Sequence, residues 1–169
     1  MKAKGFTMKN YFLDLLEFEK WANESVLAWM ESHPENPEMV KTFAHLIAEN
    51  HPWTYLLRAE QVPNDVNPVP NWTRAECRAN LEPTINALIA FVQSCENFDR
   101  AIQSPGRDGV IFENSVTEIL TALLNHAEHH RGQILWMIEK ETGEYVPSLY
   151  MSYLRKVKPK PTPSSWPSL

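Results

Sequence analysis

Residues 115–143 read SVTEILTALLNHAEHHRGQILWMIEKETG, and this stretch predicts a long amphipathic helix. Ser115 and Glu118 have the Ser-x-x-Glu spacing of a capping box, which starts a helix, and Gly143 stands where its carboxyl end would be capped. The helix is expected to run to about Glu141 and to bury one face against other helices. Apolar residues recur along that face at the helical period: Ile119, Leu123, Ala127, Ile134 and Met137.

Three further segments show the same period, and prolines separate them. They cover residues 8–32, 37–60 and 73–97. Pro52 lies inside the second segment and is expected to kink it or end one half, and Pro83 leaves the start of the third open over about ten residues. With little strand signal elsewhere, the segments predict an all-α fold, most economically a four-helix bundle. The loop after the second segment is long enough for a crossover.

The rest of the chain adds smaller features. Residues 100–114 hold Ser-Pro-Gly and Asp-Gly turns beside short apolar pieces, which predicts a small hairpin or an extended loop before the last helix. Residues 147–156 form a short, partly apolar segment that could close over one end of the bundle. We therefore assign residues 1–157 to one domain and the Pro-rich residues 158–169 to a disordered tail.

The composition fits one globular domain and excludes several functions. The chain has 169 residues, and its 16 Lys and Arg against 21 Asp and Glu give a net charge of −5. Without a basic excess, nucleic acid is a poor candidate as a partner. No apolar run approaches the ~20 residues that span a bilayer and no signal peptide is evident, so we expect no membrane partner and a cytoplasmic location. Cys77 and Cys95 lack a metal or redox spacing and are interpreted as packing residues.

Two histidines of the last helix are candidate metal ligands. His126 and His130 lie about 40° apart on a helical wheel, on the arc of the apolar residues, so both imidazoles are expected to point into the core. Side chains four residues apart on a helix can share one metal ion. The alternative is a pair of hydrogen-bonded core histidines, but unpaired imidazoles are costly in an apolar core, which favours the metal. His129 is expected at the rim of the core.

The second segment offers the third protein ligand that an open metal site needs. His45 shares a face with apolar residues and is the better candidate, whereas His51 adjoins Pro52 and is expected to face solvent. Glu49, one turn after His45, could be a fourth ligand, a hydrogen-bond acceptor for an imidazole or a general base. The alternative is a carboxylate at a helix interface that is paired with Arg or Lys. His33 is expected to be an exposed loop residue.

These residues resemble the DinB/YfiT-like family of metal-binding four-helix bundles. Residues 126–134, His-Ala-Glu-His-His-Arg-Gly-Gln-Ile, are similar to the family's His-x-x-x-His-Arg-Gly-Gln signature. His45, followed eight residues later by Trp53, resembles its second-helix pattern. Residues 21–23 and 153–155 resemble its Trp-x-Asn element and its terminal segment. The resemblance covers about residues 8–156 and leaves out the tail.

The resemblance implies an up-down-down-up four-helix bundle, commonly a homodimer, that holds a divalent metal ion, often zinc or nickel. The implied ligands are His45, His126 and His130. Gln133 belongs to the signature and is the candidate hydrogen-bond partner of a ligand imidazole. Arg131, on the opposite arc of the helix, is expected to make structural contacts. Glu49 is not carried over from the family.

The candidate centre leads to three hypotheses of function. A divalent ion held by three neutral imidazoles keeps an open position, where it lowers the pKa of a bound water toward ~7 or holds a thiolate. The resembled family includes thiol-dependent transferases and isomerases. The first hypothesis is therefore a metal-dependent S-transferase that activates a low-molecular-weight thiol for attack on a small electrophile. The others are a metal-dependent hydrolase with Glu49 as catalytic base, and a metal-binding stress-response protein without catalysis.

Overall fold

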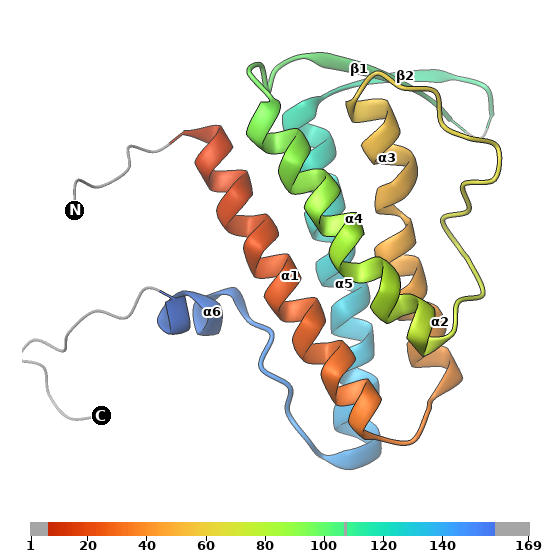
Figure 1. Ribbon diagram of the computed structural model, residues 1–169, viewed down its shortest axis with the longest axis vertical. Helices are drawn as coiled ribbons and strands as arrows, with labels where there is room; N and C mark the ends of the chain where they lie inside the picture. The colour runs from red at the N-terminus through yellow and green to blue at the C-terminus, as the bar shows by residue number, and fades with distance from the viewer. Residues whose placement is uncertain (1–6, 107, 158–169) are drawn as a thin grey trace, which may run out of the picture.

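The computed structural model describes residues 7–106 and 108–157, and most of them are helical. The all-α prediction is confirmed, with one two-stranded sheet beside the helices (Figure 1). No helix in these ranges has the length and apolarity of a membrane span. The predicted tail, residues 158–169, lies outside the described residues. The elements are α1 (Met8–Ser32), α2 (Pro37–Ala48), α3 (Asn50–Leu57), α4 (Arg74–Ser94), β1 (Ala101–Pro105), β2 (Ile111–Ser115), α5 (Val116–Thr142) and α6 (Tyr150–Val157).

The long helical stretches lie side by side. In Figure 1, α1 and α5 run downward along the chain, whereas α2, α3 and α4 run upward. Both α1 and α2 contact α4 and α5. The loop between α3 and α4, residues 58–73, leads from the upper to the lower end of the molecule (Figure 1). The arrangement brings α2 and α5, the two helices that carry the candidate ligands, into contact.

The second helical segment is broken, as its proline predicted. α2 ends at Ala48 and α3 begins at Asn50, with Glu49 between them. Pro52 lies in the first turn of α3. A backbone N–H there has no partner inside its own helix, so the proline removes no helical hydrogen bond from α3. The break places Glu49 at the junction of two helices.

Side-chain caps fix where α4 and α5 begin. Thr73 accepts a hydrogen bond from the backbone N–H of Glu76, and the Glu76 carboxylate accepts one from the N–H of Thr73. Ser115 and Glu118 form the same reciprocal pair at α5. The first box settles the start of α4, which therefore runs through Pro83 instead of beginning after it.

The predicted hairpin is present. Its strands pair antiparallel, from Ala101 opposite Ser115 to Pro105 opposite Ile111. Ser115 is thus both the last residue of the sheet and the N-cap of α5, so the hairpin leads directly into that helix. The other end of α5 is capped by Gly143 with a φ of 72°, a left-handed conformation that glycine adopts without strain.

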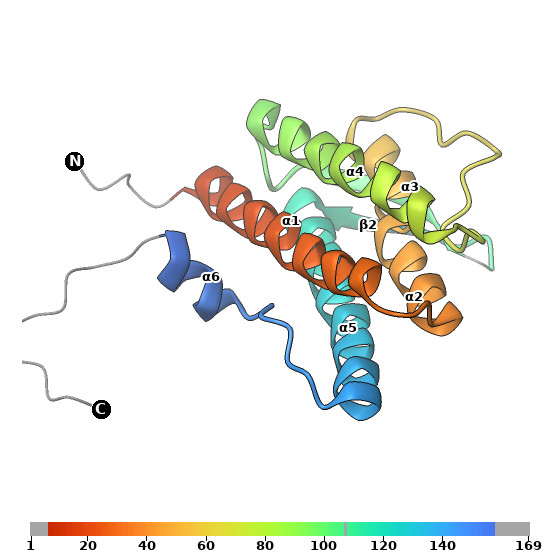
Figure 2. The same ribbon diagram turned by 60° about the horizontal axis from the view of Figure 1, so that its bottom comes forward.

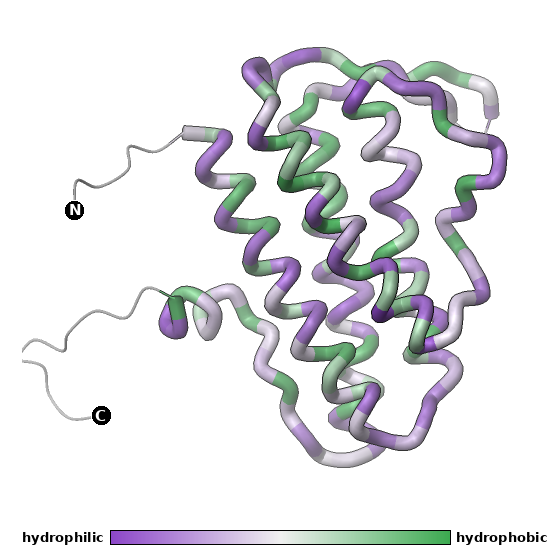
Figure 3. The backbone as a smooth tube through the Cα atoms, in the orientation of Figure 1, coloured by the Kyte–Doolittle hydropathy of each residue, from purple (hydrophilic) through white to green (hydrophobic). Residues whose placement is uncertain are grey.

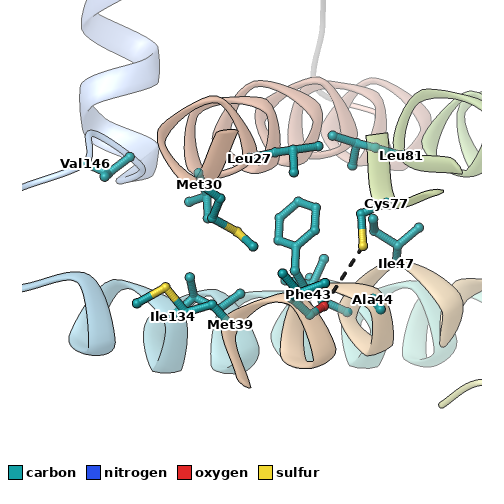
Figure 4. Packing of buried hydrophobic residues seen from close by; sticks show 14 of the residues in the cluster. Leu27, Met30, Met39, Phe43, Ala44, Ile47, Cys77, Leu81, Ile134 and Val146 are labelled. Carbon is teal, nitrogen blue, oxygen red and sulfur yellow. Dashed lines mark hydrogen bonds between the residues drawn. The ribbon is translucent and has the colours of Figure 1, made fainter. Parts of the chain in front are cut away.

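The apolar faces of the helices form two buried clusters. Figure 3 shows polar and apolar positions recurring along the helices, as the sequence period predicts. In Figure 4, Phe43 of α2 projects toward Leu27 of α1. Both Cys77 and Cys95 are buried, as expected of packing residues. Cys77 Sγ lies 4.0 Å from the carbonyl oxygen of Val40, and burial raises the pKa of its thiol to about 11 (Figure 4).

A buried ion pair connects α5 with α1. The Arg131 guanidinium is fully buried and donates to both carboxylate oxygens of Glu19, at 2.7 and 3.0 Å, and to Asn23 Oδ1 at 2.9 Å. It also contacts Glu128 on its own helix and lies over the ring of Phe18. Arg131 therefore makes the structural contacts expected from its position opposite the histidines.

The segment after α5 packs against the outer side of α1 and does not close an end of the molecule. Figure 2 shows α6 beside α1, on the side away from α4 and α2. Tyr150 and Tyr153 lie against Phe18, and Tyr153 also contacts Trp21. The expectation of a cover over one end is wrong because these aromatic partners lie along the side of α1.

Candidate metal centre

Three histidine side chains meet where α2 contacts α5. His45 comes from α2, and His126 and His130 lie one turn apart on α5. The ring centroid of His45 lies 4.9 Å from that of His126 and 4.8 Å from that of His130, and the latter two are 4.4 Å apart. One ring nitrogen of each residue lies within 4.8 Å of the other two. The structure therefore brings the three predicted side chains together around one point.

A backbone carbonyl fixes the tautomer of His45. His45 Nδ1 lies 2.6 Å from the carbonyl oxygen of Pro68, in the loop between α3 and α4. A carbonyl oxygen only accepts, so Nδ1 carries the proton and Nε2 keeps its lone pair. That Nε2 atom lies 3.2 Å from His126 Nε2. Two nitrogens bound to one tetrahedral zinc ion are about 3.3 Å apart, so this separation suits a shared ion.

Gln133 orients His130 in the same way. Gln133 Oε1 accepts a hydrogen bond from His130 Nδ1 at 2.7 Å, and its amide nitrogen lies 3.2 Å from His129 Nε2. Because Nδ1 is the donor, Nε2 is the free nitrogen of His130. Gln133 therefore orients a candidate ligand and leaves its Nε2 available to a metal ion.

The surroundings of the cluster favour neutral imidazoles. Burial first, and then the neighbouring His130 and His45, lower the pKa of His126 from 6.5 to about 4. Burial is also the main cause that lowers the pKa of His130. Neutral imidazole is the form that binds a metal ion. Both side chains of α5 are therefore in the ligand form at pH 7.

One pocket reaches the cluster at His126, and another lies beside Gln133, the hydrogen-bond partner of His130. The first has a volume of about 330 Å³ and is lined by His126 together with Glu49, Trp53, Asn114, Glu118, Ile119, Ala122 and Leu123. The second, of about 510 Å³, is lined by His129 and Gln133 together with Glu38, Thr42, Gly132, Trp136 and Met137. A small molecule in the first pocket can therefore contact His126.

Glu49 stands beside the cluster and is not part of it. The group whose ligand atoms lie within 4.8 Å of one another consists of the three histidines alone. Glu49 Oε1 accepts a hydrogen bond from Trp53 Nε1 at 3.3 Å. No Lys or Arg of the described ranges forms an ion pair with Glu49, so the interface ion pair considered from the sequence is not found there.

Sequence comparisons identify the family of the chain. Residues 14–134 match the family model described as the DinB superfamily. The chain belongs to the DinB superfamily. It is 21% identical to the Protein DinB of Bacillus subtilis (strain 168) over 168 residues, which cover 89% of this chain and 98% of that protein. No solved structure matches the chain.

The remaining histidines of this DinB-superfamily chain differ from one another. His51 is half-buried and its Nε2 lies 2.8 Å from Thr84 Oγ1, so the expectation that it faces solvent is wrong: α4 packs against α3 at this point. Burial lowers the pKa of His51. His33 is also half-buried, because its ring stacks on Trp29 with centroids 3.9 Å apart. His129 is exposed, as expected of a residue at the rim.

Sequence reasoning missed Pro68. Its carbonyl oxygen sets the proton position of His45, yet every residue has a carbonyl oxygen, and no residue pattern distinguishes this one. The loop of residues 58–73 has no helical period from which its contacts could be predicted. The crowding of prolines in that loop marks a break between helices and does not identify this contact.

Proposed function

We propose that this DinB-superfamily protein is a metal-dependent S-transferase. It binds one divalent ion, zinc or nickel, through His45, His126 and His130, and transfers a low-molecular-weight thiol to a small electrophile. The observation that carries the proposal is the cluster of three imidazoles beside a pocket of about 330 Å³. Three protein ligands with a position left for substrate are typical of catalytic zinc sites, whereas structural sites have four.

The residues present fit such an ion. The Nε2 atoms of His45 and His126 are 3.2 Å apart, and the Nδ1 atoms of His45 and His130 are engaged elsewhere. No cysteine or carboxylate of the described ranges completes the group to four. Three neutral donors leave the ion its full charge, which favours an anionic fourth ligand such as a thiolate.

The chain's own residues position the reactants. A bound divalent ion would hold the thiol as a thiolate at neutral pH and so supply the nucleophile. Pro68 and Gln133 hold the Nδ1 protons of two ligand imidazoles and so orient the rings. Trp53 and the apolar residues that line the pocket beside His126 form an apolar surface on which the electrophile can pack.

A metal-dependent hydrolase is the second candidate. The observation that favours it is the presence of Glu49 in the same pocket as His126. A carboxylate beside a metal centre can accept a proton from an attacking water, which is the role of a general base. In this case Glu49 would be the catalytic residue.

The proposal extends to the assembly and its location. We propose that the four long helical stretches form the up-down-down-up bundle of the family and that two copies form a homodimer. Trp136 on α5 is 60% exposed and is a candidate contact. Light scattering of the purified protein measures the dimer, and a monomer mass at all concentrations would refute it. We also propose a cytoplasmic location, where low-molecular-weight thiols stay reduced.

Metal analysis is the first experiment. Protein purified without a chelator is expected to carry about one equivalent of divalent metal, and His126→Ala is expected to lose it. His129→Ala is the matched control, because His129 is exposed on the same helix and is not in the cluster. If the parent carries little metal and His126→Ala changes neither metal content nor stability, the histidines are hydrogen-bonded core residues.

An activity assay then separates the enzyme hypotheses. The metal-loaded protein is expected to couple monochlorobimane to at least one member of a panel of thiols, and His126→Ala is expected to abolish this. If no thiol in the panel is coupled to monochlorobimane, the transferase hypothesis is refuted. Hydrolysis of small esters or amides that is lost in Glu49→Gln would favour the hydrolase instead, and no turnover of either kind would indicate a metal-binding protein without catalysis.

A further inference from the structure

We infer that the ligand which binds beside His126 carries a positively charged amine, and that the Glu49 carboxylate recognises it. This inference rests on the proposed metal centre and adds to it the charge of the molecule that the centre accepts. It gives Glu49 a role in specificity, distinct from that of a metal ligand or a general base.

The charges around the pocket are the first argument. Glu49 and Glu118 line it, and no Lys or Arg does. A divalent ion on neutral imidazoles would bring two positive charges, which the two carboxylates balance. A bound thiolate would then leave one negative charge in the pocket. A cation on the ligand restores the balance, whereas a carboxylate on the ligand meets repulsion from both acids.

The carboxylates of Glu118 and Glu49 differ in how many hydrogen bonds they accept from the protein. Glu118 Oε2 accepts hydrogen bonds from the backbone N–H and the hydroxyl of Ser115, at 2.7 and 3.1 Å, so it serves as a helix cap. Glu49 is the N-cap residue of α3, yet its side chain makes no capping hydrogen bond. Its Oε1 accepts from Trp53, and its Oε2 has no hydrogen-bond or ion-pair partner among the described residues. Glu49 is therefore the acid available to a ligand.

The rest of the lining suits a ligand with a cationic end and an apolar body. Trp53 is half-buried, and its indole N–H donates to Glu49. An ammonium group would pair with this carboxylate through charge-assisted hydrogen bonds. The remaining surface of the pocket is largely apolar, from Ile119, Ala122 and Leu123 of α5.

A set of small thiols of different charge tests the inference. Cysteamine, 2-mercaptoethanol and 3-mercaptopropionate carry an ammonium, a hydroxyl and a carboxylate group on the same two-carbon thiol. Their binding to the Co²⁺-loaded protein is followed by the near-ultraviolet charge-transfer absorption of a cobalt thiolate. This readout measures affinity and needs no turnover. Cysteamine is expected to bind most tightly and 3-mercaptopropionate most weakly.

Variants isolate the contribution of Glu49. Glu49→Gln keeps an acceptor for Trp53 but removes the charge, and the preference for cysteamine over 2-mercaptoethanol is expected to fall about fivefold, the scale of one partly exposed charge pair. The acidity of each thiol is the same with both proteins, so it cancels in this comparison. Glu38→Gln removes an acid from the second pocket and is expected to keep the preference.

The outcomes distinguish this inference from the proposed function. An unchanged preference in Glu49→Gln, or equal binding of cysteamine and 3-mercaptopropionate, overturns the inference alone. Loss of cobalt from Glu49→Gln also overturns it, because Glu49 would then be a metal ligand. Absence of the charge-transfer band with all three thiols refutes thiol binding at the centre, and the inference falls with it.

Discussion

Replacing Arg131 with methionine tests what the buried ion pair contributes to stability. The change removes the guanidinium that donates to both oxygens of Glu19 and leaves that residue, 5% exposed, without its charge partner. Removing one member of a buried pair costs about 3–5 kcal/mol of unfolding free energy. In a domain of this size 1 kcal/mol corresponds to about 2–4 °C, so Tm is expected to fall by about 6–20 °C.

The double variant Glu19→Leu/Arg131→Met shows whether the stability lost in Arg131→Met comes from poorer packing or from the uncompensated charge of Glu19. It removes both charges and fills the space with apolar side chains, which is often neutral for a buried pair. We expect it to recover most of the stability that Arg131→Met loses. The coupling between the two sites should be large because the two side chains touch.

Urea denaturation followed by circular dichroism, with a chelator present so that metal binding does not contribute, measures all three proteins. Burial raises the pKa of Glu19 above 4.5, and Arg131 opposes this rise. Without Arg131, the folded form binds a proton more tightly than the unfolded form. The unfolding free energy of Arg131→Met should therefore increase as the pH is lowered from about 8 toward 5. A loss below about 1 kcal/mol, or a double variant less stable than Arg131→Met, would refute this reasoning.

Three smaller changes test local features of the fold and the centre. Gln133→Leu removes the acceptor for His130 Nδ1 and is expected to lower metal affinity about 10–100-fold in competition with a chromophoric chelator, whereas an unchanged affinity would deny Gln133 a part in metal binding. Glu76→Ala removes a carboxylate whose pKa is lowered from 4.5 by a backbone N–H at the start of α4. Its stabilisation is present above that pH and is lost as the pH falls, so the difference between parent and variant in urea melts should shrink as the pH falls below 4.5. A constant difference would contradict this. Gly143→Ala puts a side chain at a φ of 72° and should cost about 1 kcal/mol in thermal unfolding, whereas Gly132→Ala, inside α5 with open space around it, should cost nothing; equal effects would refute the argument from backbone conformation.

The sequence predicted best what neighbouring residues decide among themselves. The capping box at Ser115 and the glycine at 143 mark the limits of α5, because both caps are made within a few residues of the helix ends. The break near Pro52 was predictable for the same reason. The period of α5 also put His126 and His130 on one face, where the structure has them.

Features that depend on distant parts of the chain were predicted less well. The place of His51 beside Pro52 suggested a side chain facing solvent, but it could not show that α4 brings Thr84 to that side. Likewise, His33 was expected to be an exposed loop residue, whereas its ring stacks on Trp29 of the preceding helix. A helical wheel describes one helix and says nothing of its neighbours.

The candidate centre lies between these two cases. Periodicity selected His45 over His51, and the structure places His45, not His51, in the group with His126 and His130. The place of Glu49 was open in the sequence, because a helix break changes the direction of every side chain near it. The structure puts Glu49 in a pocket with His126.

The hydrogen bond from His45 to the carbonyl of Pro68 ties the length of a surface loop to the centre. Most loops tolerate insertions, since lengthening them costs little entropy. The turn of the hairpin near Gly109 is of that kind, because nothing lies within 4 Å of the space that a side chain there would occupy. Residues inserted between Arg58 and Pro68 would instead shift the carbonyl that holds His45. Among related sequences, variation in loop length should therefore concentrate in the hairpin and spare this loop.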